Sequence, residues 1–135
     1  MSARSEVSKK NKYWIDRHRH YELKHFCLQY PIWKKTYEDE SYLSASSIDI
    51  LPRANEHGDP TSRQALFRTY YSKRIELVEK AAREADDDLY FYILKAVTEG
   101  LSYNHLKTKM NVPCGKDMYY DRYRRFFWLL DKARD

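Results

Sequence analysis

Residues 99–125 read EGLSYNHLKTKMNVPCGKDMYYDRYRR, and this stretch decides the fold. The pattern predicts that Gly100 ends one helix and that Ser102 caps a short second helix. A turn over residues 111–115 then leads into a long helix from about 116 to 133. The aromatic residues of this last helix fall on one side and many of its charged residues on the other. This order predicts a C-terminal helix-turn-helix domain, a fold that reads DNA with its last helix.

Two more helices are predicted directly before this stretch. Asp59-Pro60 pairs an N-cap with a first-turn proline, so a helix is expected over residues 60–84. Phe67, Val78 and Ala82 lie on one of its faces. The acidic run at 86–88 begins the next helix, because carboxylates are favoured at the positive end of the helix dipole.

Two further helices are predicted near the N-terminus. Residues 12–29 contain no Gly or Pro and form an amphipathic helix, and Pro31 starts a short helix to about residue 40. Residues 41–59 hold loop-forming residues, with 48–51 as a short strand or a tethered extended piece. The expected fold class is therefore all-α.

Composition agrees with a helical protein built around one core. The chain has 135 residues, of which 42% are hydrophobic and 33% charged, with only three Gly and four Pro. This length excludes a multidomain enzyme, and no apolar stretch is long enough for a membrane span, so a cytoplasmic protein is expected. We divide the chain into an N-terminal helical arm (1–40), a hinge (41–59) and a helix-turn-helix domain (60–135).

The charge is basic at both ends. Lys and Arg exceed Asp and Glu by 25 to 20, giving a formal net charge of +5. Residues 1–35 carry nine basic and three acidic side chains, and residues 102–135 carry eight and four. This distribution favours a polyanionic partner, above all double-stranded DNA.

Three segments carry a resemblance to a known family. Residues 99–106, 110–113 and 118–125 resemble the pattern of phage RinA/ArpU-type transcriptional regulators, which are similar to the promoter-reading domain of sigma factors. Gly58-Asp59-Pro60-Thr61 also resembles the start of the preceding helix in that family, so the resemblance covers about residues 58–133. It implies a DNA-binding phage or prophage regulator in a bacterial host cell, with no cofactor.

The resemblance and the charge pattern together predict a DNA-binding surface. The start of the supporting helix and the outer face of the last helix are expected to contact bases and phosphates. The expected residues are Ser102, Tyr103, Lys107, Lys116, Asp117, Tyr120, Asp121, Arg122, Arg124 and Arg125. Asp117 and Asp121 depart from the expectation of a cationic surface, because carboxylates repel phosphate unless they accept from a cytosine amino group. The alternative is a solvated helix face on which the arginines pair with these carboxylates.

Metal and catalytic chemistry are not expected. His18, His20, His25 and Cys27 include no pair at the i, i+4 spacing that directs two ligands to one ion from a helix. The sequence also lacks the motifs of a phosphate-binding loop, a metalloprotease or a serine nucleophile. We therefore expect neither an enzyme nor a metal site.

Self-association is predicted for the first helix. Trp14, Tyr21 and Leu28 stand at heptad spacing, which favours a homo-oligomer, most simply a dimer. The alternative is that this face folds back onto the chain's own residues 60–85.

Two other classes of function remain open. The chain can be a small phage protein that binds or inhibits a host protein, for which acidic outer positions would mimic DNA, or it can be a packaging adaptor. Host RNA polymerase or another protein is a further candidate partner of a regulator.

Overall fold

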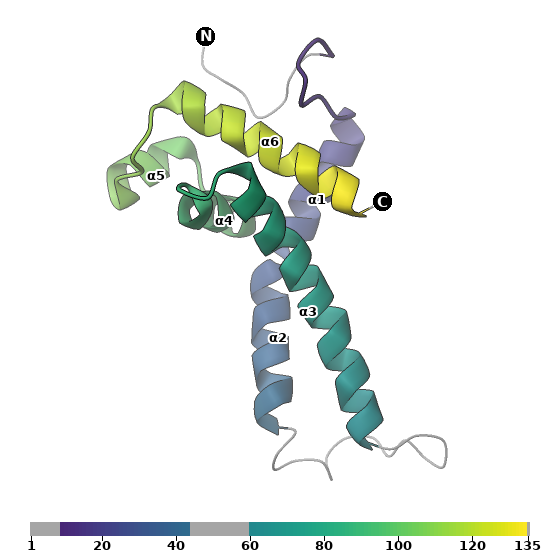
Figure 1. Ribbon diagram of the computed structural model, residues 1–135. Coiled ribbons are helices and arrows are strands. Elements are labelled where there is room, and N and C mark those ends of the chain that lie inside the picture. Colours follow the sequence, from purple (N-terminus) through teal and green to yellow (C-terminus); the bar gives the residue numbers. More distant parts are fainter. Residues whose placement is uncertain (1–8, 44–59, 135) are drawn as a thin grey trace. The chain divides into compact units, whose positions relative to one another are not determined.

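The computed structural model describes residues 9–43 and 60–134 (Figure 1). Within these ranges the chain forms helices and no strand, so the all-α class is confirmed. The helices are α1 (Arg17–Leu28), α2 (Tyr30–Leu43), α3 (Pro60–Ala85), α4 (Tyr90–Glu99), α5 (Tyr103–Met110) and α6 (Lys116–Arg134). The strand considered at 48–51 lies outside the described residues. No helix in the described ranges has both the length and the apolar character needed to cross a membrane.

The helix boundaries around α5 follow local signals in the sequence. Gly100 ends α4 in the left-handed region, with φ 70°. The Ser102 hydroxyl caps α5 by accepting a hydrogen bond from the His105 backbone N–H at 3.1 Å. Asn111 ends α5, also in the left-handed region, with φ 54°. Asparagine is one of the few residues besides glycine that adopt this conformation routinely, and the predicted boundaries are confirmed.

Two predicted helix starts are wrong. The helix expected over 12–29 begins only at Arg17, because the Asp16 carboxylate caps it by accepting from the His18 backbone N–H at 2.9 Å. The helix expected from residue 86 begins at Tyr90. The Asp86 carboxylate instead accepts from the backbone N–H groups of Asp88 and Leu89, which stabilises a turn before the helix.

The described chain divides into two compact units. The first unit contains the chain up to Gln29 and from Leu77 onward, and the second unit is Tyr30–Glu76. The boundary therefore lies within α3. Helix α1 contacts α4 and α6, so it belongs to the same unit as the C-terminal helices and is not a separate N-terminal arm.

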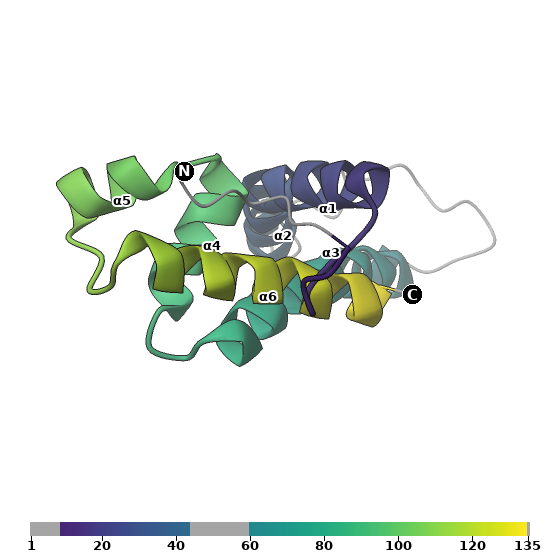
Figure 2. The ribbon, with the colours of Figure 1, turned by 90° about the horizontal axis from the view of Figure 1, so that it is seen from above.

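The core of the first unit forms around the inner face of α6. Tyr119, Phe126, Phe127 and Leu130 are buried along this face, as the aromatic periodicity predicted. Leu23 of α1, Ile93 of α4 and Leu106 of α5 are fully buried in the same unit. Figures 1 and 2 both show α5 beside the first turns of α6, with α1 crossing the C-terminal half of α6.

The second unit consists of α2 and the first part of α3 (Figure 1). Tyr30, Trp33 and Ile75 are buried, and the Arg68 guanidinium lies 5.6 Å from the centre of the Tyr37 ring. The apolar face predicted for residues 60–84 holds only in part. Val78 is buried, whereas Phe67 is 42% exposed.

We expect Gly100→Ala to lower the free energy of unfolding by about 1 kcal/mol, because a side chain is strained at φ 70°. Crowding is not the cause, since an added Cβ would lie an ordinary 3.7 Å from Leu28 Cδ2. Gly115→Ala is the control, because a Cβ there meets no atom within 4 Å and the φ is not positive. Urea unfolding of both variants measures the difference, and equal losses would contradict this reason.

Candidate nucleic-acid interface

Helix α5 and the turn that follows it are fixed to each other by two contacts. The Tyr103 hydroxyl donates a hydrogen bond to the Cys114 carbonyl oxygen at 2.7 Å. The Val112 backbone N–H donates to the Leu106 carbonyl oxygen at 3.1 Å, and both of these side chains are buried. Tyr103, predicted to contact phosphate, therefore uses its hydroxyl to hold the turn.

A cluster of tyrosines fixes the first turns of α6. The buried Tyr119 ring lies 5.5 Å from the Tyr103 ring and 5.1 Å from the Tyr120 ring, measured between centroids. Burial raises the pKa of the Tyr119 hydroxyl above its ordinary value, so this residue stays neutral. The Tyr119 side chain thus points inward, and Tyr120 stays half-buried.

Three lysines lie on the outside of this region. Lys107 and Lys109 are in the last turns of α5, Lys116 begins α6, and all three are exposed. None of them forms an ion pair within the part of the chain that the structure describes. Their positive charge is therefore directed to solvent on both sides of the turn.

The arginines of α6 are placed differently from the prediction. Arg122 donates to the Asp86 carboxylate at 2.9 Å and also pairs with Asp121. The hydrogen bond to Asp86 is the main reason that the pKa of the Arg122 guanidinium is raised. Arg125 donates to the Glu84 carbonyl oxygen and to the Tyr13 hydroxyl, each at 3.3 Å.

These contacts assign the arginines to the fold. Arg122 and Arg125 join α6 to the end of α3 and to the segment before α1, and Arg124 is half-buried with its Nε atom buried. Their predicted role as DNA contacts stays a prediction, because the three side chains are half-buried and Arg122 and Arg125 already have partners within the fold. The alternative reading, in which an arginine pairs with Asp121, is the one that the structure favours for Arg122.

The two aspartates in the first two turns of α6 have different surroundings. Asp121 is half-exposed and its charge is offset by Arg122. Asp117 is exposed in the first turn of α6, where a carboxylate interacts favourably with the helix dipole. Only Asp117 therefore places an unbalanced negative charge beside the lysines.

A small pocket lies beside the start of α5. Its volume is about 190 Å³, and Lys24, Leu28, Ser102 and Tyr123 are among the residues that line it. It brings a lysine of α1 close to the N-terminus of α5, where backbone N–H groups favour anions. The Ser102 side chain itself is used as the helix cap.

The residues predicted for self-association do not share one helix. Trp14 precedes α1, Tyr21 is half-buried on it, and Leu28 is its last residue. Trp14 and Leu28 are exposed, whereas Leu23 and Phe26 of α1 are buried in the first unit. The predicted heptad stripe is therefore wrong as a single helical face, and dimerisation through α1 stays a prediction.

The histidines and cysteines considered for a metal site are distributed between the core and the surface. His20 is buried, with its ring 4.8 Å from the Phe127 ring in an edge-on arrangement. Cys27 is fully buried, which raises the pKa of its thiol, while His18 and His25 are exposed. The described residues contain no group of three or more side chains placed to hold a metal ion.

Three residues of this region lie outside the predicted set of contacts. Lys109 is exposed on α5 but is not among the predicted contacts, and Lys24 has no local signal because only the folded chain places it in the pocket that Ser102 also lines. Asp86 was interpreted only as a helix-dipole residue. Asp86 and Arg122 are 36 positions apart in the sequence, and no local sequence pattern predicts their ion pair.

We expect Tyr103→Phe to lower the free energy of unfolding by about 1 kcal/mol, because it removes the hydrogen bond to the Cys114 carbonyl. Tyr119→Phe makes the same chemical change at a buried hydroxyl with no hydrogen-bond partner among the described residues. It should leave the stability unchanged or raise it. Thermal and urea unfolding of the two variants test this, and a larger loss for Tyr119→Phe would contradict it.

We expect Arg122 and Asp86 to stabilise the fold together. The Asp86 side chain is only 12% exposed, so the pair is partly shielded from water, and Arg122→Ala should cost about 1 to 2 kcal/mol. A double-mutant cycle with Asp86→Asn measures the coupling energy. Lys95→Ala is the control, because its pair with Glu99 is an exposed i, i+4 pair worth only about 0.5 kcal/mol. A coupling energy near zero would show that the two charges act independently.

Comparison with known proteins leaves the function to be argued from this chain alone. No family model, curated protein or solved structure matches it. The resemblance to RinA/ArpU-type regulators stays a prediction.

Proposed function

We propose that the first unit binds double-stranded DNA with the surface formed by α5, the turn and the first turns of α6, and that the protein is a transcriptional regulator of the RinA/ArpU type. The observation that carries this proposal is that Lys107 and Lys109 of α5 and Lys116 of α6 are all exposed and form no ion pair among the described residues. Exposed lysines without an acidic partner favour contact with phosphate, because such contacts release counterions from the DNA.

The order of the helices supports an assignment of roles. Tyr119 and Phe126 bury the inner side of α6, so its first turn presents Lys116 and Asp117 outward. In helix-turn-helix readers this end of the last helix meets base edges in the major groove. Helix α5 would then lie over the DNA backbone, with Lys107 as a phosphate contact and its N-terminus near Lys24 as a second one.

Under this proposal, Arg122 and Arg125 would orient α6 and would not contact DNA themselves. Arg122 and Arg125 connect α6 to elements behind it, which holds its first turns in a fixed orientation. A helix held in this way loses little conformational freedom when it binds. We therefore assign direct DNA contact to the lysines and to Tyr120, and orientation of the helix to the arginines.

We expect Lys107→Ala and Lys116→Ala each to weaken binding to all duplexes and to reduce the slope of log affinity against log salt by about one. Fluorescence anisotropy of a labelled duplex at several salt concentrations measures both effects with the full chain. Lys95→Ala is the matched control, because it removes one lysine that is paired with Glu99 at 2.7 Å on α4.

Two results would contradict the proposal. The first is that the unmodified chain does not bind duplex DNA at low salt. The second is that Lys95→Ala changes the affinity and the salt slope as much as Lys116→Ala does, since the charge of the whole molecule and not this surface would then be responsible.

A further inference from the structure

The first half of α3 carries an exposed apolar surface. Leu66 is 70% exposed, Phe67 42% and Tyr70 49%, and their spacing along the helix places them within about 100° of one another around its axis. Single exposed apolar residues are ordinary, but three large ones within five positions form a patch that favours contact with another molecule. We call this patch, together with Arg63 and Tyr71, the α3 face.

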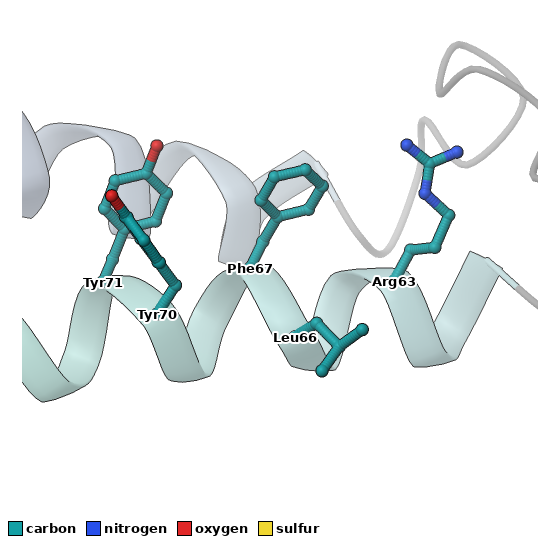
Figure 3. A pocket seen from close by; sticks show the side chains of 5 residues that line it. All are labelled: Arg63, Leu66, Phe67, Tyr70 and Tyr71. Atoms are coloured by element: carbon teal, nitrogen blue, oxygen red, sulfur yellow. The ribbon is translucent and has the colours of Figure 1, made fainter.

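The α3 face is concave enough to accept side chains. Its five residues line a pocket of about 410 Å³, and Figure 3 shows them along successive turns of the helix. Among the described residues that line it, Arg63 is the one charged member and the others are aliphatic or aromatic. A site for a small polar ligand needs several convergent polar groups, which this pocket lacks. The pocket is suited to apolar side chains of a larger partner.

The charges around the α3 face are positive. At 100° per residue Arg63, Lys73 and Arg74 lie on the side of α3 that carries Leu66 and Tyr70, whereas Arg68 and Glu76, the one carboxylate among residues 63–76, fall away from it. The Arg74 guanidinium stacks on Tyr70, 3.6 Å from the ring centre, so a cation lies directly on the patch. The patch is thus apolar at its centre and cationic at its edge.

This charge argues against two other occupants. Antiparallel pairing with a second copy that matches Phe67 to Tyr70 would bring Arg63 opposite the second copy's Arg74, and like charges repel. A nucleic acid would satisfy the cations, but Leu66, the most exposed residue of the patch, offers no aromatic surface on which a base can stack.

We infer that the α3 face binds an amphipathic helix of a partner protein whose apolar side chains are flanked by Asp or Glu. The apolar side chains would enter the pocket between Leu66, Phe67 and Tyr70, and the carboxylates would pair with Arg63, Lys73 and Arg74. This inference does not depend on DNA binding, because it concerns residues of the second unit alone.

The test is a selection with the full chain. A phage-displayed library of random helical peptides is enriched on the unmodified protein and depleted on a Leu66→Ser, Tyr70→Ser variant. Both positions are exposed, so the variant should keep its fold, which circular dichroism checks. We expect the enriched peptides to combine apolar residues at i, i+3 and i+4 spacing with Asp or Glu, and to bind the variant about tenfold more weakly or worse.

A pair of charge variants tests the electrostatic part. Lys73→Glu should weaken a selected peptide severalfold, whereas Lys80→Glu should not, because both lysines are exposed on α3 but Lys80 lies two turns beyond the patch. Equal effects of the two variants would overturn the inference. Enriched peptides that lack carboxylates, or peptides that bind the serine variant equally well, would also overturn it.

Other occupants give distinct results, and each overturns the inference. Sedimentation of the unmodified chain as a dimer and of the serine variant as a monomer would identify a second copy. If no peptide is enriched but single-stranded nucleic acid binds the unmodified chain and not the serine variant, the occupant is a polynucleotide. A selected peptide that binds only after Ile48, Ile50 and Leu51 are replaced by serine would identify the chain's own segment.

Discussion

Burial of the aromatic side of α6 is the constraint on which the rest of the first unit depends. Phe126 and Phe127 are almost completely buried, and a helix that buries adjacent bulky rings has a fixed rotation about its own axis. That rotation decides where every other residue of α6 points. It directs Arg122 toward Asp86 and leaves Lys116 in solvent. The electrostatic character of the outer surface is therefore a consequence of packing inside the unit.

The elements that the sequence predicted well are those that local chemistry determines. A left-handed glycine at Gly100, a serine cap at Ser102 and a proline at Pro60 each act within one helical turn, and all three helix boundaries agree with expectation. Aromatic periodicity also predicted the buried side of α6. Each of these signals depends only on neighbouring residues, so it can be predicted from the sequence alone.

The candidate site was only partly predictable, because contacts between distant segments decide it. Arg125 contacts Tyr13 across 112 positions, and the sequence around either residue looks like an ordinary charged or aromatic helix face. The exposure of Phe67 on α3 could not be predicted from the sequence for a related reason. Phe67 and Val78 share one helical periodicity, yet Val78 is buried and Phe67 is not, since burial depends on whether another element covers that turn.

The exposed cations of the proposed interface are lysines and not arginines. This difference would determine what kind of recognition the interface supports. A guanidinium matches guanine edges and phosphate oxygens with two parallel hydrogen bonds, whereas an ammonium is a compact charge with no preferred plane. Under the proposed function, exposed Lys107, Lys109 and Lys116 would hold a phosphate backbone by charge and would distinguish bases poorly. Discrimination between base sequences would fall to neutral groups beside them, such as the exposed amide of Asn104 and the hydroxyl of Tyr120.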